Sequence, residues 1–250
     1  MNKVYLVGAG PGDPELLTLK AWRLLKEAGL IVYAGSLVPQ EILQPLPAVK
    51  IDSASLTLEE IIGHLERGVR EHQVVVRLHS GDPSLYGAIH EEMRLLEAQG
   101  IPYEVVPGVS SFLAGAAALK VELTIPEITQ TVILTRAPGR TPVPEDIAQL
   151  AQHQATMVLF LSASLLEKVV PELVRGGYPE ETPAVCVYRV GWPEQKIIWG
   201  TLASLPRQIK EAGIRKQALI YLGRALDPPR DKRSKLYDPH FSHGARARKP

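Results

Sequence analysis

A short apolar strand runs directly into a glycine-rich loop near the start of the chain. Residues 4–15 read Val-Tyr-Leu-Val-Gly-Ala-Gly-Pro-Gly-Asp-Pro-Glu. The three glycines permit backbone conformations and close approaches that a Cβ atom would prevent. Asp13-Pro14 then combines a capping side chain with a proline suited to the first helical position, so we expect a helix to begin here. In an open α/β sheet such a turn lies where ligands bind, beyond the carboxyl ends of the strands.

The loop departs from a dinucleotide-binding fingerprint at two positions. That fingerprint needs a small residue beside the pyrophosphate where this chain has Asp13, whose carboxylate would repel phosphate. Pro11 also lacks the backbone N–H that cradles phosphate. The second predicted strand ends in Tyr-Ala-Gly-Ser at residues 33–36, without an acid for a ribose diol. These departures disfavour a nicotinamide-dependent oxidoreductase.

The strand-to-helix corner recurs twice along the first half of the chain. A predicted strand at residues 74–78 precedes Ser-Gly-Asp-Pro at 80–83, and one at 103–106 precedes Pro-Gly-Val-Ser-Ser at 107–111. The polar residue of any one corner is explained by helix capping, worth about 1 kcal/mol. If the strands are parallel, however, all three corners lie along one edge of the sheet. Their recurrence therefore favours a binding edge.

The pattern of predicted strands and helices indicates an α/β fold with two domains. Residues 1–120 are expected to form a domain with a parallel-rich sheet, and residues 121–130, which contain a proline and no clear period, a linker. Residues 131–226 form the second domain, whose sheet should be mixed because residues 190–194 resemble a hairpin turn. The proline-rich, basic residues 227–250 are typical of a mobile tail.

Composition excludes several other classes of protein. A net charge of +1 over 250 residues lacks the excess of positive charge that attracts nucleic acid or an anionic membrane. No apolar run approaches the roughly 20 residues that span a bilayer, and the first residues lack a secretory leader pattern. The single cysteine, Cys186, lies in an apolar run, which indicates a buried side chain and a reducing cytoplasm. The seven histidines show no metal-ligand spacing, and the closest pair, His240 and His243, lies in the polar tail.

Three glycine corners in this order and spacing resemble those of the tetrapyrrole methylases. The matching motifs are residues 7–13, residues 80–83 with Tyr-Gly at 86–87, and residues 107–111. Further segments resemble one branch of that family, which methylates carbon 11 of precorrin-4 or cobalt-precorrin-4 in cobalamin synthesis. These segments are residues 33–39, 135–136, 139–145 and 234–243.

The resemblance implies a fold, a cofactor and a partner. Members of the family have two α/β domains with the active site in the trough between them, use S-adenosylmethionine and form homodimers. Because the sulfonium is already an activated electrophile, transfer to an electron-rich ring carbon needs alignment more than a protein nucleophile. The resemblance therefore implies a small-molecule tetrapyrrole as partner and no metal ligand in the protein, while the net charge and the lack of long apolar runs already predict no nucleic acid and no membrane partner.

The motifs of the family also imply which residues contact the cofactor. Their carbonyl, hydroxyl and carboxylate groups would fix its polar ends, and Asp82 would meet its amino or ribose groups. For Leu161 and Tyr188 the alternative is packing in the core. The implied cofactor-binding residues are Pro11, Ser80, Gly81, Asp82, Ser110, Ser111, Leu161, Tyr188 and Thr201.

The tetrapyrrole carries carboxylates on its rim, so its site needs cations. Arg136 and Arg140 follow a predicted strand and are the first candidates, with Arg189 behind them; each could instead be a solvated loop arginine. Gly10 would let the backbone approach the macrocycle. Asp13 is the candidate catalytic residue, positioning the substrate or managing a proton, and its alternative role is helix capping.

Two other readings remain open at the level of sequence. One is a family member acting at another carbon, such as another precorrin methyltransferase or a uroporphyrinogen methylase. The other is a tetrapyrrole-binding protein that keeps the fold without turnover. More distant relatives modify ribosomal RNA or diphthine, and the near-neutral charge disfavours the RNA enzymes.

Overall fold

The computed structural model describes residues 2–229 and residue 242. The predicted tail beyond residue 229, with His240, His243 and all but one residue of the 234–243 motif, lies outside the described residues. The chain packs into two compact units. Among residues 2–229, the first comprises residues 2–114 and Arg189–Pro193, and the second comprises Gly115–Tyr188 and residues 194–229.

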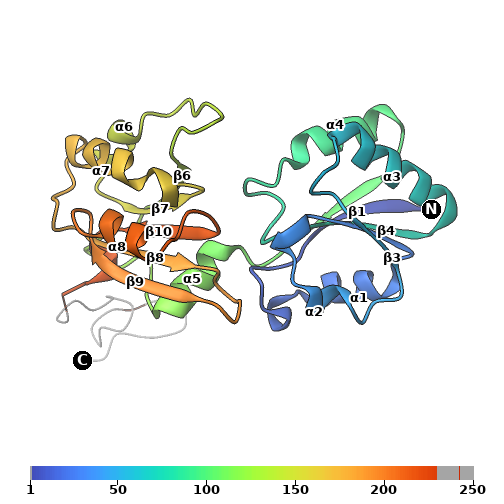
Figure 1. Cartoon of the computed structure of the whole chain (residues 1–250), viewed down its shortest axis with the longest axis horizontal. Helices are drawn as coiled ribbons and strands as arrows, with labels where there is room; N and C mark the ends of the chain where they lie inside the picture. The colour runs from blue at the N-terminus through green and yellow to red at the C-terminus, as the bar shows by residue number, and fades with distance from the viewer. Residues whose placement is uncertain (1, 230–241, 243–250) are drawn as a thin grey trace. The chain divides into compact units, whose positions relative to one another are not determined.

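The first unit contains a sheet of five parallel strands (Figure 1). In spatial order they are β3 (Val49–Asp52), β2 (Leu30–Tyr33), β4 (Val74–His79), β1 (Lys3–Gly8) and β5 (Tyr103–Val106). The parallel sheet predicted from the sequence is confirmed. β3 was not predicted, because as an exposed edge strand with alternating charged residues it lacks the apolar run that marks the others.

Helices cover both faces of this sheet. One face packs on α1 (Leu19–Glu27) and α2 (Gln40–Leu43), and the other on α3 (Leu58–Glu71) and α4 (Ile89–Ala98). Side chains along β4 alternate between the two cores, because successive residues of a strand point to opposite faces. Arg77 and His79 therefore share the face that carries α3 and α4.

The starts of the helices confirm one predicted cap and correct two others. The sequence spacing of Thr57 and Glu60 predicts a capping box, and the two residues form it at the start of α3. Asp13 caps only a short 3-10 turn, Pro14–Leu16, and α1 begins later with Thr18 as its cap. Asp82 does not cap α4, which begins at Ile89 after a left-handed Ala88.

The second unit contains the predicted mixed sheet. β6 and β7 are parallel, whereas β7 with β10, β10 with β8, and β8 with β9 are antiparallel. The strands in spatial order are β6 (Val132–Arg136), β7 (Thr156–Phe160), β10 (Ala218–Leu222), β8 (Pro183–Tyr188) and β9 (Lys196–Thr201). The helices are α6 (Ile147–Ala151), α7 (Leu166–Arg175) and α8 (Leu205–Glu211).

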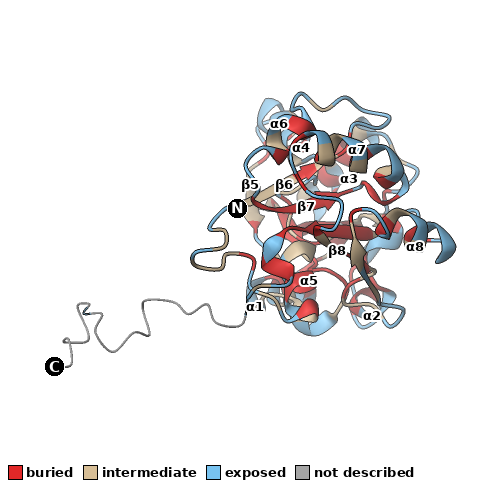
Figure 2. Ribbon diagram, turned by 90° about the vertical axis from the view of Figure 1, so that its left-hand side faces the viewer, coloured by how far each residue is buried: buried red, intermediate tan, exposed pale blue. Residues whose placement is uncertain are grey.

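Apolar side chains of the strands form the core of each unit, and β7 is buried along its length (Figure 2). Cys186 on β8 lies in the core of the second unit, as predicted, and burial raises the pKa of its thiol to about 12. Short 3-10 turns occur at Gly35–Leu37, Ala163–Leu165 and Arg224–Leu226. Within residues 2–229, no helix is long and apolar enough to cross a membrane.

The division between the units falls earlier than the sequence suggested. The linker was expected at residues 121–130, whereas the division lies between Ala114 and Gly115, inside α5 (Ser111–Leu119). Gly115 explains this position, since a Cβ there would lie 2.0 Å from the Tyr221 hydroxyl of β10. The second half of α5 thus packs in the second unit.

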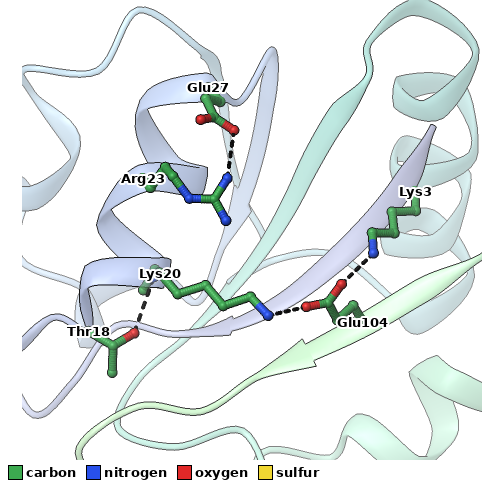
Figure 3. Close-up of polar contacts among 7 residues, drawn as sticks. Lys3, Thr18, Lys20, Arg23, Glu27 and Glu104 are labelled. Carbon is green, nitrogen blue, oxygen red and sulfur yellow. Dashed lines mark hydrogen bonds and ion pairs between the residues drawn. The ribbon is translucent and has the colours of Figure 1, made fainter. Parts of the chain in front are cut away.

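Glu104 on β5 receives two lysine side chains within the first unit. Lys3 on β1 and Lys20 on α1 each donate to one of its carboxylate oxygens (Figure 3). Their hydrogen bonds hold the pKa of Glu104 down to about 2. The two ion pairs are partly exposed. They link β1, α1 and β5 and lie away from residues 80–83.

Candidate functional site

The first two glycine corners are joined by backbone hydrogen bonds. The Gly10 N–H donates to the Gly81 carbonyl at 3.2 Å, and the Gly81 N–H donates to the Gly10 carbonyl at 2.7 Å. The Ala9 N–H, one residue before Gly10, donates to the carbonyl of His79, two residues before Gly81, at 2.7 Å. Gly10 and Gly81 form an antiparallel bridge, so backbone hydrogen bonding continues beyond the parallel strands β1 and β4 into their loops.

The third corner lies against the other two. A Cβ on Gly108 would lie 2.2 Å from the Gly81 carbonyl oxygen and 2.8 Å from the Gly8 Cα. A Cβ on Gly8 would lie 2.6 Å from the same oxygen. These are backbone atoms, which cannot rotate away. Glycine at both positions therefore allows the three strand ends to converge, as the sequence predicted.

Asp82 connects two of the corners through its side chain. One carboxylate oxygen accepts from the Ser84 N–H at 2.8 Å, and the other accepts from the Gly108 N–H at 2.9 Å. A carboxylate that accepts two backbone N–H groups is fixed in orientation. Asp82 therefore has a structural role beside the cofactor role implied by the resemblance.

Beside Gly81 the backbone leaves room. Gly81 has a left-handed φ of +63°, and a Cβ there would meet nothing closer than the Ser111 nitrogen at 3.8 Å and the Ser110 Cα at 4.0 Å. Ser110 is buried and Ser111 is half-buried at the start of α5. Four of the predicted cofactor residues, Ser80, Gly81, Ser110 and Ser111, thus lie in neighbouring corners.

The glycine loop of residues 10–13 contacts the segment Arg189–Pro193, which belongs to the same unit. The Trp192 indole N–H donates to the Pro11 carbonyl at 3.0 Å, and a Cβ on Gly12 would collide with the ring. The guanidinium carbon of Arg189 lies 4.6 Å from the centre of that ring, a cation–π contact. Arg189 is thereby brought to the same loop as Gly10 and Pro11.

Asp13 serves as a cap in this loop. Its side chain accepts from the Glu15 N–H at 2.9 Å. This bond supports the capping role considered from the sequence, and the catalytic role of Asp13 stays a prediction.

In the second unit, the ends of β6 and β7 are held by a buried hydroxyl. Ser162 donates to the Phe160 carbonyl at 2.6 Å and accepts from the Ala137 N–H at 2.7 Å. These two hydrogen bonds hold the ends of β6 and β7 together. Arg136, which pairs with Phe160, therefore lies near Leu161. Leu161 has a left-handed φ of +53° and is 70% exposed, so core packing does not explain it.

Strand direction separates two other predicted cofactor residues. Tyr188 ends β8, which runs in the same direction as β7 because both are antiparallel to β10. Thr201 ends the antiparallel β9 and pairs with Pro183 at the start of β8. At about 3.3 Å per residue, the five steps from Pro183 to Tyr188 span roughly 17 Å. The structure thus does not bring Thr201 to the edge that carries Tyr188 and Leu161. Tyr188 also packs partly on the core.

The two candidate arginines of the loop after β6 differ in their contacts. Arg136 donates to the Thr141 carbonyl at 3.3 Å and to the Pro142 carbonyl at 2.8 Å, so its guanidinium orders the loop. Arg140 is exposed in that loop. Arg136 uses two of the five N–H donors of a guanidinium, which leaves others for an anion.

Sequence reasoning missed three features beside these corners: Trp192, Ser162, and a buried charge cluster of Arg77, His79 and Glu92. Trp192 between a glycine and a proline at a hairpin tip was a usable signal, since a large aromatic side chain is unusual in a tight turn. Charged residues inside the apolar run of β4 were another. Ser162 carried no signal.

The arrangement can bind polar groups of a small molecule through backbone, hydroxyl and guanidinium groups at the carboxyl edge of a parallel sheet. Among residues 2–229, no group of three or more histidine, cysteine or acidic side chains could hold a metal ion.

Comparison with known proteins gives a family match over most of the chain. Residues 3–206 match the family model described as tetrapyrrole (corrin/porphyrin) methylases. A protein from Methanocaldococcus jannaschii named cobalt-precorrin-4 C(11)-methyltransferase is 50% identical over 246 residues, which cover 97% of this chain and 95% of that protein.

Solved structures give the same result. The X-ray structure of a cobalt precorrin-4 methyltransferase has a TM-score of 0.88 and 49% identity, covering 90% of this chain and 96% of its own. A uroporphyrin-III C-methyltransferase from Thermus thermophilus, complexed with S-adenosylhomocysteine, has a TM-score of 0.78 and 35% identity, covering 90% and 99%.

Proposed function

This chain belongs to the tetrapyrrole methylase family, and we propose that it transfers a methyl group from S-adenosylmethionine to carbon 11 of cobalt-precorrin-4 or precorrin-4. The observation that carries the proposal is 50% identity along nearly the whole of both chains with a protein named for that reaction. The similarity to a uroporphyrin-III methyltransferase, at 35% identity, is lower. Carbon 11 is therefore favoured over other positions on the macrocycle.

The corners of the first unit fit S-adenosylmethionine as the methyl donor. This group supplies a methyl that is already activated by a positive sulfur, so the protein has to bind and align it. The space beside Gly81, with the backbone of Ser110 and Ser111 as its nearest neighbours, would be filled by a Cβ at residue 81. A backbone-lined space of this kind suits a ligand that presents amide, hydroxyl and amine groups.

We assign donor binding to the residues of these corners and to the ends of β7 and β8. Ser80, Gly81, Ser110 and Ser111 contribute backbone and hydroxyl groups, and Asp82 keeps Gly108 and Ser84 in place while its carboxylate faces the donor's polar groups by the family's motif. The remaining assignments are Pro11, Leu161, Tyr188 and Thr201, of which Thr201 has the weakest geometric support.

Substrate binding is assigned to arginines, because the macrocycle carries carboxylates. Arg189 is held at the glycine loop by Trp192, and Arg136 is held by two carbonyls, so both guanidinium groups are pre-ordered. Arg140 adds a cation in the loop after β6, and Gly10 allows close approach of the backbone. Asp13 positions the substrate in addition to capping Pro14–Leu16.

Assembly and location follow from the family resemblance. We propose a homodimer that works in the cytoplasm. Size-exclusion chromatography with light scattering tests the dimer, and a mass near 27.4 kDa, that of one chain, would contradict it.

The decisive experiment is a methyl-transfer assay with both substrates. Purified protein is incubated with labelled S-adenosylmethionine and either cobalt-precorrin-4 or precorrin-4, and the product is analysed by mass spectrometry and NMR. We expect a gain of one methyl group at carbon 11, and the two rates identify the preferred substrate. A methyl group at another carbon would assign the chain to a different member of the family. Binding without transfer would indicate a non-catalytic tetrapyrrole carrier.

Arginine variants test the substrate assignment in the same assay. Arg136→Ala and Arg140→Ala should each raise the KM for the tetrapyrrole about tenfold, which corresponds to roughly 1.4 kcal/mol, and leave affinity for S-adenosylhomocysteine unchanged. Arg67→Ala, on an exposed part of α3, is the control. Wild-type kinetics in both variants would remove these arginines from the site.

A further inference from the structure

The first unit contains a cluster of buried charges that neither the donor nor the substrate assignment uses. Arg77 and His79 on β4 and Glu92 on α4 are 6%, 4% and 3% exposed. Arg77 Nε donates to one Glu92 oxygen at 2.8 Å, and His79 Nε2 lies 3.2 Å from the other. The Glu92 carboxylate therefore bridges two side chains of one strand.

Electrostatics favour an ionised Glu92. Burial pushes the pKa of Glu92 upward, but the hydrogen bond from His79 and the charges of His79 and Arg77 together lower it below its usual value. Arg77 Nη1 donates to Ser53 Oγ at 2.9 Å and to the Val32 carbonyl of β2 at 3.5 Å. Ser53 in turn donates to the Tyr33 carbonyl at 2.8 Å. The cluster is thus internally satisfied.

The position of the cluster gives it a role beyond packing. Residues 80–88 connect the end of β4 to the start of α4, and they carry Ser80, Gly81 and Asp82. His79 immediately precedes this loop, and its carbonyl also accepts from Ala9 of the first glycine loop. Glu92 lies in the first turn of α4, four residues after the loop ends. The His79–Glu92 contact therefore joins the two ends of the loop.

The far end of the loop adopts left-handed backbone conformations. α4 begins without a side-chain cap, because Ala88 occupies the cap position in a left-handed conformation. Tyr86 is also left-handed, and a Cβ on Gly87 would lie 2.2 Å from the Pro83 carbonyl oxygen. Non-glycine residues in this region of φ cost free energy, so such a loop persists only when its surroundings hold it.

We propose that Glu92 is a positioning residue for donor binding: by holding His79 and Arg77, it fixes both ends of the loop that carries Ser80, Gly81 and Asp82. This inference rests on the proposed function, because the ligand it concerns is the methyl donor. Glu92 does not touch the donor itself and acts through the geometry of the loop.

The test compares Glu92→Gln with Glu91→Gln. Glutamine keeps the size of the side chain but removes the charge that pairs with Arg77, and it offers His79 an amide in place of a carboxylate. Glu91 lies in the same turn and is exposed, which makes it the matched control. Calorimetry with S-adenosylhomocysteine should give an affinity at least tenfold weaker in Glu92→Gln and unchanged in Glu91→Gln, because displacements of about 1 Å can cost up to ~10²-fold.

Kinetics and hydrogen exchange separate positioning from stability. In Glu92→Gln the KM for S-adenosylmethionine should rise at least tenfold while kcat at saturating donor changes far less. In the ligand-free protein, amides of residues 80–88 should exchange faster and those of β4 should not. Wild-type KM and affinity in a folded Glu92→Gln protein would overturn the proposal, as would unchanged exchange in the loop.

Two further measurements keep the test decisive. If Glu92→Gln does not fold, His79→Gln replaces it, since this variant leaves the Arg77–Glu92 pair intact; the same pattern of weaker binding and faster exchange is expected, and its absence would refute the role. Failure of the wild-type protein to bind S-adenosylhomocysteine would instead count against the proposed function. The exchange result would still show whether Glu92 fixes the loop of residues 80–88.

Discussion

The two sheets bring the ends of their strands together in different ways. In the first unit, five parallel strands send their ends to one edge, and three of those ends meet through backbone contacts that only glycine permits. In the second unit the sheet is mixed, two parallel strand ends are tied by the Ser162 hydroxyl, and Thr201 lies at the opposite edge from Tyr188. Strand direction therefore decides which strand ends can share a site.

This difference predicts that the two edges respond differently to small changes. In the first unit, any atom added where the corners meet should destabilise the protein, because it would clash with backbone atoms that cannot rotate away. In the second unit, removal of one hydroxyl should destabilise the protein, because a buried N–H then loses its hydrogen-bond partner. The three variants that follow run from the largest expected effect to the smallest.

Gly108→Ala should have the largest effect. Its Cβ would lie 2.2 Å from the Gly81 carbonyl oxygen, so the corners must separate. Overpacking of this kind costs typically 1–3 kcal/mol and at times more, and we expect about 3 kcal/mol or more in urea denaturation, with loss of S-adenosylhomocysteine binding.

Two matched glycine variants complete that comparison. Gly63→Ala, in α3, meets only Arg67 Nη1 at 3.9 Å and should stabilise the protein slightly, by about 0.5–1 kcal/mol. Gly139→Ala, after β6, meets only a Leu165 methyl at 3.4 Å and should be nearly neutral. If Gly108→Ala were as stable as these two, the close approach of the corners would be refuted.

Ser162→Ala should have an intermediate effect, confined to the second unit. The Ala137 N–H, now buried without a partner, should lower the free energy of unfolding by about 1–3 kcal/mol. Ser164→Ala, which alters an exposed serine two residues later, is the control. Equal stabilities of the two variants in urea would show that the hydroxyl does not hold the ends of β6 and β7.

Glu104→Gln should have the smallest effect, which should be present at neutral pH and disappear in acid. The pKa of Glu104 is lowered to about 2 by Lys20 and Lys3, so its stabilising contribution is present above about pH 4.5 and is lost as the pH falls towards 2. In thermal denaturation the variant should show a slightly lower Tm at pH 7 and a shallower fall in Tm between pH 4.5 and 2. Salt should reduce the difference. Glu145→Gln, an exposed loop acid, is the control, and identical acid profiles would contradict the ion pairs.

Much of the fold could be predicted from the chain because its signals are local. Apolar runs such as Val74 to Val76 mark buried parallel strands, and Thr57 with Glu60 marks a helix start. The edge strand Val49–Asp52 was missed because an exposed edge need not be apolar. Asp13 does cap a helical turn, but only the 3-10 turn Pro14–Leu16, while α1 begins later with Thr18 as its cap. The helix start assigned to Asp82 was wrong, because its side chain bonds to the Ser84 N–H in a turn and α4 begins only at Ile89.

The candidate site was predictable where it depends on strand ends and unpredictable where it depends on distant contacts. Gly81, Ser110 and their neighbours come from a recurring local motif. The roles of Ser162 and Glu92 depend on partners 25 and 13–15 residues away, and nothing in a single sequence specifies those pairings. Thr201 was grouped with Tyr188 by the family's motifs, although the predicted hairpin turn at residues 190–194 already implies that β9 runs opposite to β8.

The bond between Trp192 and Pro11 has a consequence for how the protein is made. The two residues are 181 positions apart, yet both belong to the first unit. At a synthesis rate of about 5–20 residues per second, the indole emerges roughly 10–40 s after the loop it covers. During that interval Gly12 in the nascent amino-terminal half lacks its contact with the Trp192 ring. A fragment ending at Ala114 would keep this unfinished state permanently, so the first unit is completed only when the ribosome has passed Pro193.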